Sequence, residues 1–117
     1  MVSAINTSAS GAVAFQKKIS VIANNVANVN TDQFKKSRVN FQEGTDGGVQ
    51  TETKKVNTTG HLRKEIEKGE IVEKESSNVD LAEEITESIP AHRGYEANLK
   101  MMKAHDEMLK NLINIMG

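Results

Sequence analysis

The sequence contains no cysteine and no tryptophan, and it has one proline among its 117 residues. Without cysteine, the chain cannot form a disulfide, a cysteine metal site or a thiol nucleophile. Three Phe and one Tyr are the only aromatic residues, and 37% of the chain is apolar, so no thick globular core can be built. No run of roughly 18 apolar residues is present, so we expect no insertion into a membrane.

The charged residues are numerous but balanced. They make up 26% of the chain, yet the net charge is only −1. A protein that binds nucleic acid without sequence preference needs a strongly basic face, so we expect no nucleic-acid partner. The N-terminal residues also lack the charged and apolar regions of a secretory signal, and we expect no cleavable signal peptide.

Two periodic stripes occupy the ends of the chain, and in both of them residues recur at alternating steps of three and four. Such a 3.5-residue repeat is typical of helices that wrap around one another. We expect the two helices to pack on each other and on copies of themselves. The N-terminal stripe comprises Ile5, Ala12, Phe15, Ile19, Ile22, Val26 and Val29, with Ser8 filling its one gap. The C-terminal stripe comprises Leu81, Ile85, Tyr95, Leu99, Met102, Leu109, Ile113 and Met116, with Ser88, His92 and Asp106 at the remaining positions.

We predict a mainly α fold, in which two long N- and C-terminal helices pack as an antiparallel coiled-coil-like pair around a small β-rich or extended middle segment. The N-terminal helix is expected within residues 1–31, the middle segment within 32–76, and the C-terminal helix, one structural unit with the first, within 77–117. Residues 49–56 have the composition of a strand, and residues 62–67 and 70–75 flank a possible hairpin turn. The middle segment has too few apolar residues to fold alone, so we expect exposed strands that need a neighbour.

Local signals predict where the helices begin, end and bend. We expect the first helix to end at Asn28 or Asn30. Ser77, with Asp80 three residues later, resembles a capping box for the second helix, and Asn78 is an alternative cap. Pro90 lacks an amide hydrogen, which predicts a kink just before it.

Polar residues at the end of the first helix have two interpretations. Four Asn lie within residues 24–30. Either the helix frays here and an Asn adopts the left-handed C-cap conformation, which we favour, or the amides bridge to other chains. For Lys35, Lys36 and Arg38 we favour a solvated basic face over a specific site for an acidic partner.

Candidate catalytic and metal-binding residues are few. His92 and Glu96 lie one helical turn apart, but neither a second His at helical spacing nor a Cys accompanies them. The sequence has no phosphate-binding glycine loop and no nucleophile elbow. We therefore predict no enzymatic activity, no cofactor, no metal and no small-molecule substrate.

Motifs at both ends resemble those of a known family. Residues 23–28 read Ala-Asn-Asn-Val-Ala-Asn, with Thr31 and Phe34 following; residues 77–80 read Ser-Asn-Val-Asp; residues 92–98 read His-Arg-Gly-Tyr-Glu-Ala-Asn; and residues 105–109 read His-Asp-Glu-Met-Leu. In this order they resemble the signature motifs of the bacterial flagellar axial proteins, the rod and hook family. Gln33 stands where the family usually has Gly, a residue that permits a positive φ, and His92 stands where Gln is usual.

The resemblance implies a flagellar basal-body rod protein of the short proximal-rod type. Such a protein is a structural subunit that assembles through its terminal helices into a hollow axial tube that transmits torque. The implied partners are the protein itself, other flagellar rod proteins and the flagellar type III export apparatus. The implied location is the periplasm-spanning rod of the basal body. The alternative is a generic two-helix coiled-coil adaptor unrelated to motility.

The expected assembly surface combines residues of both stripes with polar motif residues that set the register of the helices. These residues are Ile5, Phe15, Ile19, Ile22, Asn24, Asn25, Val26, Asn28, Leu81, Ile85, Arg93, Tyr95, Glu96, Asn98, Leu99, Met102, Leu109 and Ile113.

Overall fold

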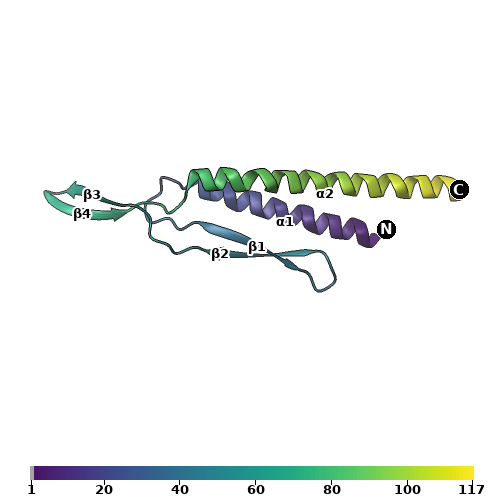
Figure 1. Cartoon of the computed structure of the whole chain (residues 1–117), viewed down its shortest axis with the longest axis horizontal. Coiled ribbons are helices and arrows are strands. Elements are labelled where there is room, and N and C mark those ends of the chain that lie inside the picture. Colours follow the sequence, from purple (N-terminus) through teal and green to yellow (C-terminus); the bar gives the residue numbers. More distant parts are fainter. Residues whose placement is uncertain (1) are drawn as a thin grey trace.

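The computed structural model describes residues 2–117, which form two helices and four strands (Figure 1). Their order is α1 (Val2–Ala27), β1 (Ser37–Glu43), β2 (Val49–Lys55), β3 (Leu62–Glu67), β4 (Glu70–Glu75) and α2 (Leu81–Met116). The prediction of a mainly α fold is wrong, because the four strands pair into two complete antiparallel hairpins and sheet is a substantial part of the chain. The apolar pattern of the sequence underestimates the sheet content, because these strands are exposed and charged and therefore carry few apolar residues.

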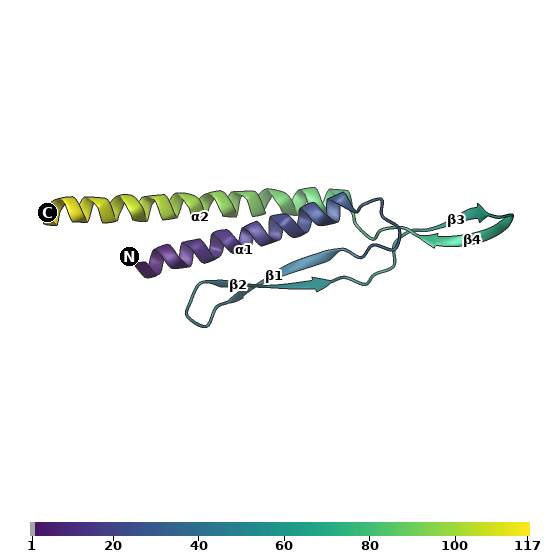
Figure 2. The ribbon, with the colours of Figure 1, turned by 180° about the vertical axis from the view of Figure 1, so that it is seen from behind.

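Helices α1 and α2 lie side by side and antiparallel in both ribbon views (Figures 1 and 2). Two glycines lie in their interface. A methyl group added to Gly11 would lie 2.7 Å from Oδ1 of Asn98, and one added to Gly94 would collide with the ring of Phe15. The side chain of Asn98 also donates to the carbonyl oxygen of Gly94 at 2.8 Å. Small residues thus permit the close approach of the two helices.

The apolar core is thin. Its buried apolar residues are Ala12, Ala14, Ile22 and Ala91, three of which are alanine. Because burial stabilises in proportion to the apolar area removed from water, these small side chains contribute little each. The shape agrees with a thin core: the radius of gyration is 21.0 Å, against about 13 Å for a compact chain of this length.

Two expectations for the C-terminal helix are wrong. Its N-cap is Asp80, whose carboxylate accepts from the amide of Ala82, and neither Ser77 nor Asn78 caps it. The helix also continues through Pro90, and Figure 1 shows no sharp bend there. Thr86, whose carbonyl loses its partner to Pro90, is exposed like the proline. Water can therefore solvate the freed carbonyl, and the helix remains continuous.

The first hairpin, β1–β2, lies along α1 on the side away from α2 (Figures 1 and 2). The rings of Phe41 in β1 and Phe15 in α1 meet edge to face, with centroids 5.0 Å apart. Next to the turn of the hairpin, the amide of Val49 donates to Oγ of Ser10 at 3.1 Å. Strand β1 was not predicted. Its apolar pattern in the sequence is short, and the contact with α1 that supports the strand exists only in the folded chain.

The second hairpin, β3–β4, projects beyond the helices (Figure 1). Its turn matches the predicted one: Lys68 has a φ of 52° and Gly69 a φ of 83°. Two successive positive φ values are typical of a type I′ turn, whose twist suits a two-residue hairpin loop. With this projection, the molecule measures 82 × 24 × 19 Å.

The turn after α1 contains a strained residue. Gln33 has a φ of 61°, the left-handed conformation that usually favours glycine. Its amide donates to the carbonyl oxygen of Glu75 at the end of β4, at 2.9 Å. The turn geometry that we associated with a Gly at this position is therefore adopted by Gln33, and a contact with the second hairpin holds it.

We expect Gly94→Ala to lower the free energy of unfolding by about 1 kcal/mol. Alanine favours a helix by up to about 1 kcal/mol over glycine, but overpacking costs about 1–3 kcal/mol, and the ring of Phe15 is held between Gly94 and Phe41. Urea denaturation checks this. In a Phe15→Leu background the same change should cost less, and stabilisation by Gly94→Ala alone would contradict the close approach.

Candidate functional site

A polar junction joins the end of α1, the start of β1 and the first turn of α2. At its centre lie Asn25 and Glu84, both with no exposed surface. Nδ2 of Asn25 donates to Oε2 of Glu84 at 3.2 Å. The junction thus connects residues that are far apart in the sequence.

The side chain of Asn25 bonds both the amide and the carbonyl oxygen of one residue of β1, as the backbone of a neighbouring strand would. Its Oδ1 accepts from the amide of Ser37 at 3.0 Å, and its Nδ2 donates to the carbonyl oxygen of Ser37 at 2.9 Å. The favoured interpretation of the Asn cluster, a left-handed Asn C-cap, is wrong, because Gln33 and Lys68 are the non-glycine residues of 2–117 with a positive φ. Nδ2 of Asn28 instead donates to the carbonyl oxygen of Asn24 at 2.9 Å, and Asn25 forms bonds within its own chain to β1 and α2.

Arg38 supplies the positive charge of the junction. Its Nη1 donates to Oε1 of Glu84 at 2.6 Å, and its Nη2 lies 2.8 Å from Oε1 of Glu83. Burial lowers the pKa of the Arg38 guanidinium, but hydrogen bonds with Glu83 and Glu84 and their charges raise it by more, so the pKa lies above its ordinary value. A buried ion pair without further bonds would be costly, and here Asn25 satisfies the second oxygen of Glu84.

The neighbouring lysines are paired as well. Nζ of Lys36 donates to Oε2 of Glu83 at 2.9 Å, and Lys35 forms an ion pair with Glu75. The interpretation of Lys35, Lys36 and Arg38 as a solvated basic face is therefore wrong. They bind acidic residues of the same chain, an outcome that no spacing rule in the sequence indicates.

Asn78 forms a second backbone clamp beside the junction. Its Oδ1 accepts from the amide of Lys36 at 2.7 Å, and its Nδ2 donates to the carbonyl oxygens of Val56 and Thr58 at 2.7 and 3.0 Å. The adjacent Ser77 is buried. Sequence reasoning missed Asn78 and Glu84 as key residues; the Ser-Asn-Val-Asp motif was the available signal for Asn78.

The arrangement holds segments together and offers little for catalysis. Among residues 2–117, no group of three or more His, Asp or Glu side chains is placed to hold a metal ion. His92 and Glu96 both lie on the exposed side of α2. Within the same described residues, neither helix has an apolar stretch long enough to cross a bilayer.

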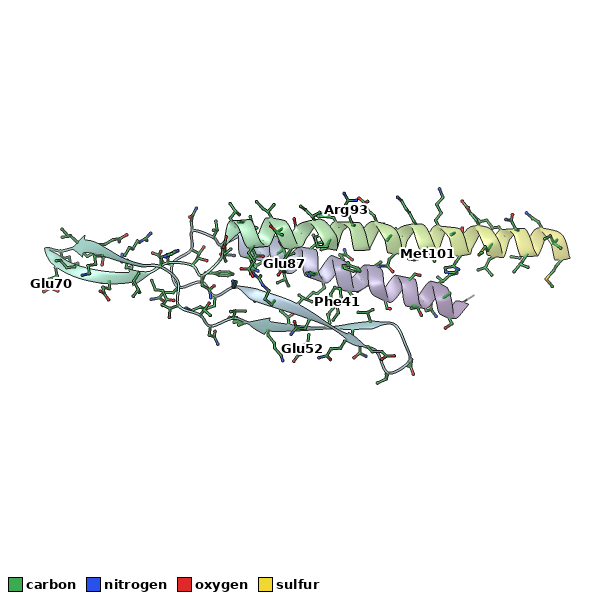
Figure 3. The ribbon with its side chains drawn as sticks, in the orientation of Figure 1. Phe41, Glu52, Glu70, Glu87, Arg93 and Met101 are labelled. Atoms are coloured by element: carbon green, nitrogen blue, oxygen red, sulfur yellow. The ribbon has the colours of Figure 1, made fainter. Side chains whose placement is uncertain are left out.

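The predicted assembly residues divide into two groups. Those that are buried or half-buried in the single chain are Ile5, Phe15, Ile19, Ile22, Asn25, Val26, Asn28, Tyr95, Asn98, Met102 and Leu109. Those that are exposed in the single chain are Asn24, Leu81, Ile85, Arg93, Glu96, Leu99 and Ile113. Figure 3 shows Arg93 pointing away from α1, and Phe41 pointing from β1 toward α1.

An apolar surface of α2 therefore faces away from α1. Leu81, Ile85 and Ile89 follow one another at steps of four and are 44%, 53% and 54% exposed. At this spacing they share one face of the helix. The side of α2 that contacts α1 instead carries Glu84 and Ala91, both buried.

We expect Glu84→Ala to destabilise the fold by about 3 kcal/mol, because it leaves the partly buried Arg38 without its closest carboxylate. Glu84→Gln keeps the shape and should cost less. Glu87→Gln is the matched control, since its carboxylate lies 3.9 Å from Nε of Arg38 and is partly exposed. Urea denaturation measures all three, and equal costs for Glu84→Ala and Glu87→Gln would contradict the role of Glu84.

We expect acid to weaken the junction. Hydrogen bonds from Lys36 and then Arg38 hold the pKa of Glu83 below its ordinary 4.5, and Lys35 does the same for the pKa of Glu75. A lowered pKa stabilises the fold above pH 4.5, and this stabilisation is lost as the pH falls through the lowered value. The loss should be modest because Glu83 is 42% exposed. Unfolding measured across this pH range should show a shallower dependence for Glu83→Gln.

Comparison with known proteins gives two matches that fall on the terminal elements. The family described as "Flagella basal body rod protein" matches residues 5–35, and the family described as "Flagellar basal body rod FlgEFG protein C-terminal" matches residues 74–115. The first range covers most of α1 and the turn after it, and the second covers the end of β4 and nearly all of α2.

Similar individual proteins match over a short stretch. The flagellar basal-body rod protein FlgG of Bacillus subtilis (strain 168) is 51% identical over 41 residues, which are 35% of this chain and 16% of the relative. The flagellar hook protein FlgE of Rhizobium meliloti (strain 1021) is 49% identical over 41 residues, 35% of this chain and 10% of the relative. The chain thus spans 10–16% of the length of these relatives.

The two family matches cover most of α1 and α2, the helices that the Asn25–Glu84 contact joins, and leave β1, β2, β3 and most of β4 outside. On these grounds the chain belongs to the flagellar basal-body rod and hook family.

Proposed function

We propose that this protein is a structural subunit of the flagellar rod, and that it assembles through α1 and α2 into a hollow axial tube. The single observation that carries the proposal is the exposed apolar face of α2, formed by Leu81, Ile85 and Ile89. A helix face of this kind normally lies against another helix. Within a family of rod and hook proteins, neighbouring subunits are the natural partners.

The charge distribution supports contact between subunits. Residues 1–31 carry two lysines and no acidic residue, whereas residues 76–117 carry seven acidic and four basic residues. Opposite net charges on the two helices set the orientation of an association more than its strength. Copies of the chain therefore favour placing α1 of one subunit near α2 of another.

The polar junction suits a part that transmits torque. It attaches the start of the first hairpin to both helices through Asn25, Arg38 and Glu84. The second hairpin is attached through Lys35 and Glu75. A force on the hairpins is thereby passed to the helices rather than to a flexible linker.

The size of the middle segment supports the short proximal-rod type. Only residues 36–73 lie between the two family matches, and two hairpins account for most of them. We further propose export by the flagellar type III apparatus without a cleavable signal, and a position in the periplasm-spanning rod. A generic two-helix adaptor is less well supported, because the matches at both ends are to flagellar proteins.

Deletion of the gene should abolish motility, and electron microscopy of isolated basal bodies should show an absent or truncated rod. Expression of the wild-type chain should restore both. An intact rod in the deletion strain would overturn the proposal.

A surface variant separates assembly from folding. Ile85→Asp with Ile89→Asp should leave the helix content unchanged, because both side chains are more than half exposed, and should fail to restore motility. Burial of each isoleucine in a contact is worth about 1.5–3 kcal/mol, which two carboxylates remove. The matched control is Ala97→Asp with Ala104→Asp, which adds the same charge at exposed positions of α2. Restored motility with the isoleucine variant would contradict the role of this face.

A further inference from the structure

The two ends of the elongated molecule are both apolar and uncovered. At one end, the β3–β4 hairpin projects beyond the helices, and at the other, α2 extends past α1 (Figure 1). We call residues Leu62, Ile66 and Ile71 the hairpin face, and residues 108–116 of α2 the helix tail. The two elements lie toward opposite ends of a molecule that is 82 Å long.

The hairpin face lies on one side of β3–β4, where the cross-strand pair Lys64–Glu73 separates Leu62 from Ile66 and Ile71. Ile66 pairs directly with Ile71, and Leu62 lies on the same side because it is four residues from Ile66. These three side chains are 77%, 72% and 61% exposed in that order. A lone two-stranded hairpin with an apolar face is marginally stable in water, so a covering layer would stabilise it.

The opposite side of the same hairpin needs no partner. Nε of Arg63 lies 2.9 Å from Oε1 of Glu65, and Nζ of Lys74 lies 3.1 Å from Oε2 of the same carboxylate. Lys74 also forms an ion pair with Glu67. The charges of this side, which also carries Val72, are therefore neutralised within the hairpin, and the side with Leu62, Ile66 and Ile71 is the more apolar one left for a contact. Figure 3 places Glu70 at the tip, where the two sides meet.

The helix tail is bare because of the register between the helices. Gly11 lies opposite Asn98 and Phe15 opposite Gly94, so the start of α1 falls opposite residues near 107. The nine residues that follow have no α1 beside them. Ile113, Ile115 and Met116 in this tail are 67%, 82% and 86% exposed.

We propose that the helix tail of one copy docks on the hairpin face of the next copy, so that subunits associate head to tail along their long axis. This inference rests on the proposed function as a rod subunit. The hairpin face and the helix tail each lack the second layer that a sheet or helix normally packs against. Docking one on the other would cover both. A contact between two different surfaces can repeat as an open filament when its rotation does not close into a ring, and growth along an axis requires such a contact, whereas like-with-like pairing stops at a dimer.

Charge favours the same choice of partner. Residues 108–117 contain one basic residue, Lys110, and no acidic residue, whereas residues 62–75 contain four basic and five acidic residues. Pairing the helix tail with the hairpin therefore brings a net charge of +1 beside a net charge of −1, which attract. Pairing hairpin with hairpin or tail with tail places net charges of one sign together.

Cysteine cross-linking tests the contact directly, because the natural chain has no cysteine. Chains carrying Ile66→Cys and chains carrying Ile113→Cys, distinguished by mass, are mixed at high concentration and oxidised. The mixed dimer should form several-fold more than either homodimer. A chain carrying both substitutions should give a ladder of oligomers, since its two thiols lie too far apart to join within one molecule.

The matched control pairs Ile113→Cys with Val13→Cys, a site on α1 that is 64% exposed and outside the hairpin face. Equal yields for the two mixtures, or a predominance of homodimers, would overturn the head-to-tail contact. If cross-linking fails while the deletion strain lacks its rod, only this inference falls. If cross-linking succeeds while the deletion strain keeps its rod, the proposed function falls and the contact stands.

Discussion

The structure depends on the buried contact between Asn25 and Glu84. It lies where two helices and a strand converge, since Asn25 of α1 bonds both Ser37 at the start of β1 and Glu84 of α2. Asn25 provides both a donor and an acceptor to Ser37, so it fixes the direction in which the chain leaves α1. Arg38 then neutralises Glu84 from the first residues of β1. The arrangement is polar, and its main effect is to specify one geometry rather than to add stability.

A polar junction has this importance because the apolar core is so small. Most buried apolar side chains of the described residues are alanines, and the helices approach through Gly11 and Gly94. Such an interface is close and well defined in register, yet it removes little apolar surface from water. The larger side chains that a globular protein would bury, such as Ile85 and Ile113, are exposed.

This distribution is what a subunit of an axial assembly requires. A single chain needs a defined shape before it joins its neighbours, and the junction and the glycines supply that shape. Its larger apolar side chains, such as Ile85 and Ile113, stay exposed, and we propose that they form the contacts between chains. Exposed apolar surface on this scale in a single chain normally marks an interaction site. The exposed apolar face of α2 and the two uncovered ends thus agree with membership in a family of rod and hook proteins.

The sequence alone was sufficient for the features that depend on local periodicity and local turns. The two long helices followed from repeats of three and four, the β3–β4 turn from Lys68 and Gly69, and the family from motifs at both ends. It was insufficient for the sheet content, the N-cap at Asp80 and the course of α2 through Pro90. Those outcomes depend on whether a neighbouring element or water satisfies a backbone group.

Only the tertiary structure decided which face of each helix is covered. The residues of α2 that contact α1, such as Glu84, Gly94 and Asn98, are polar or small, so an apolar pattern could not identify them. The same holds for Lys35, Lys36 and Arg38, whose acidic partners lie some forty residues away in sequence. Periodicity reports which residues are apolar, whereas the pairing of buried charges depends on distances that exist only after the chain has folded.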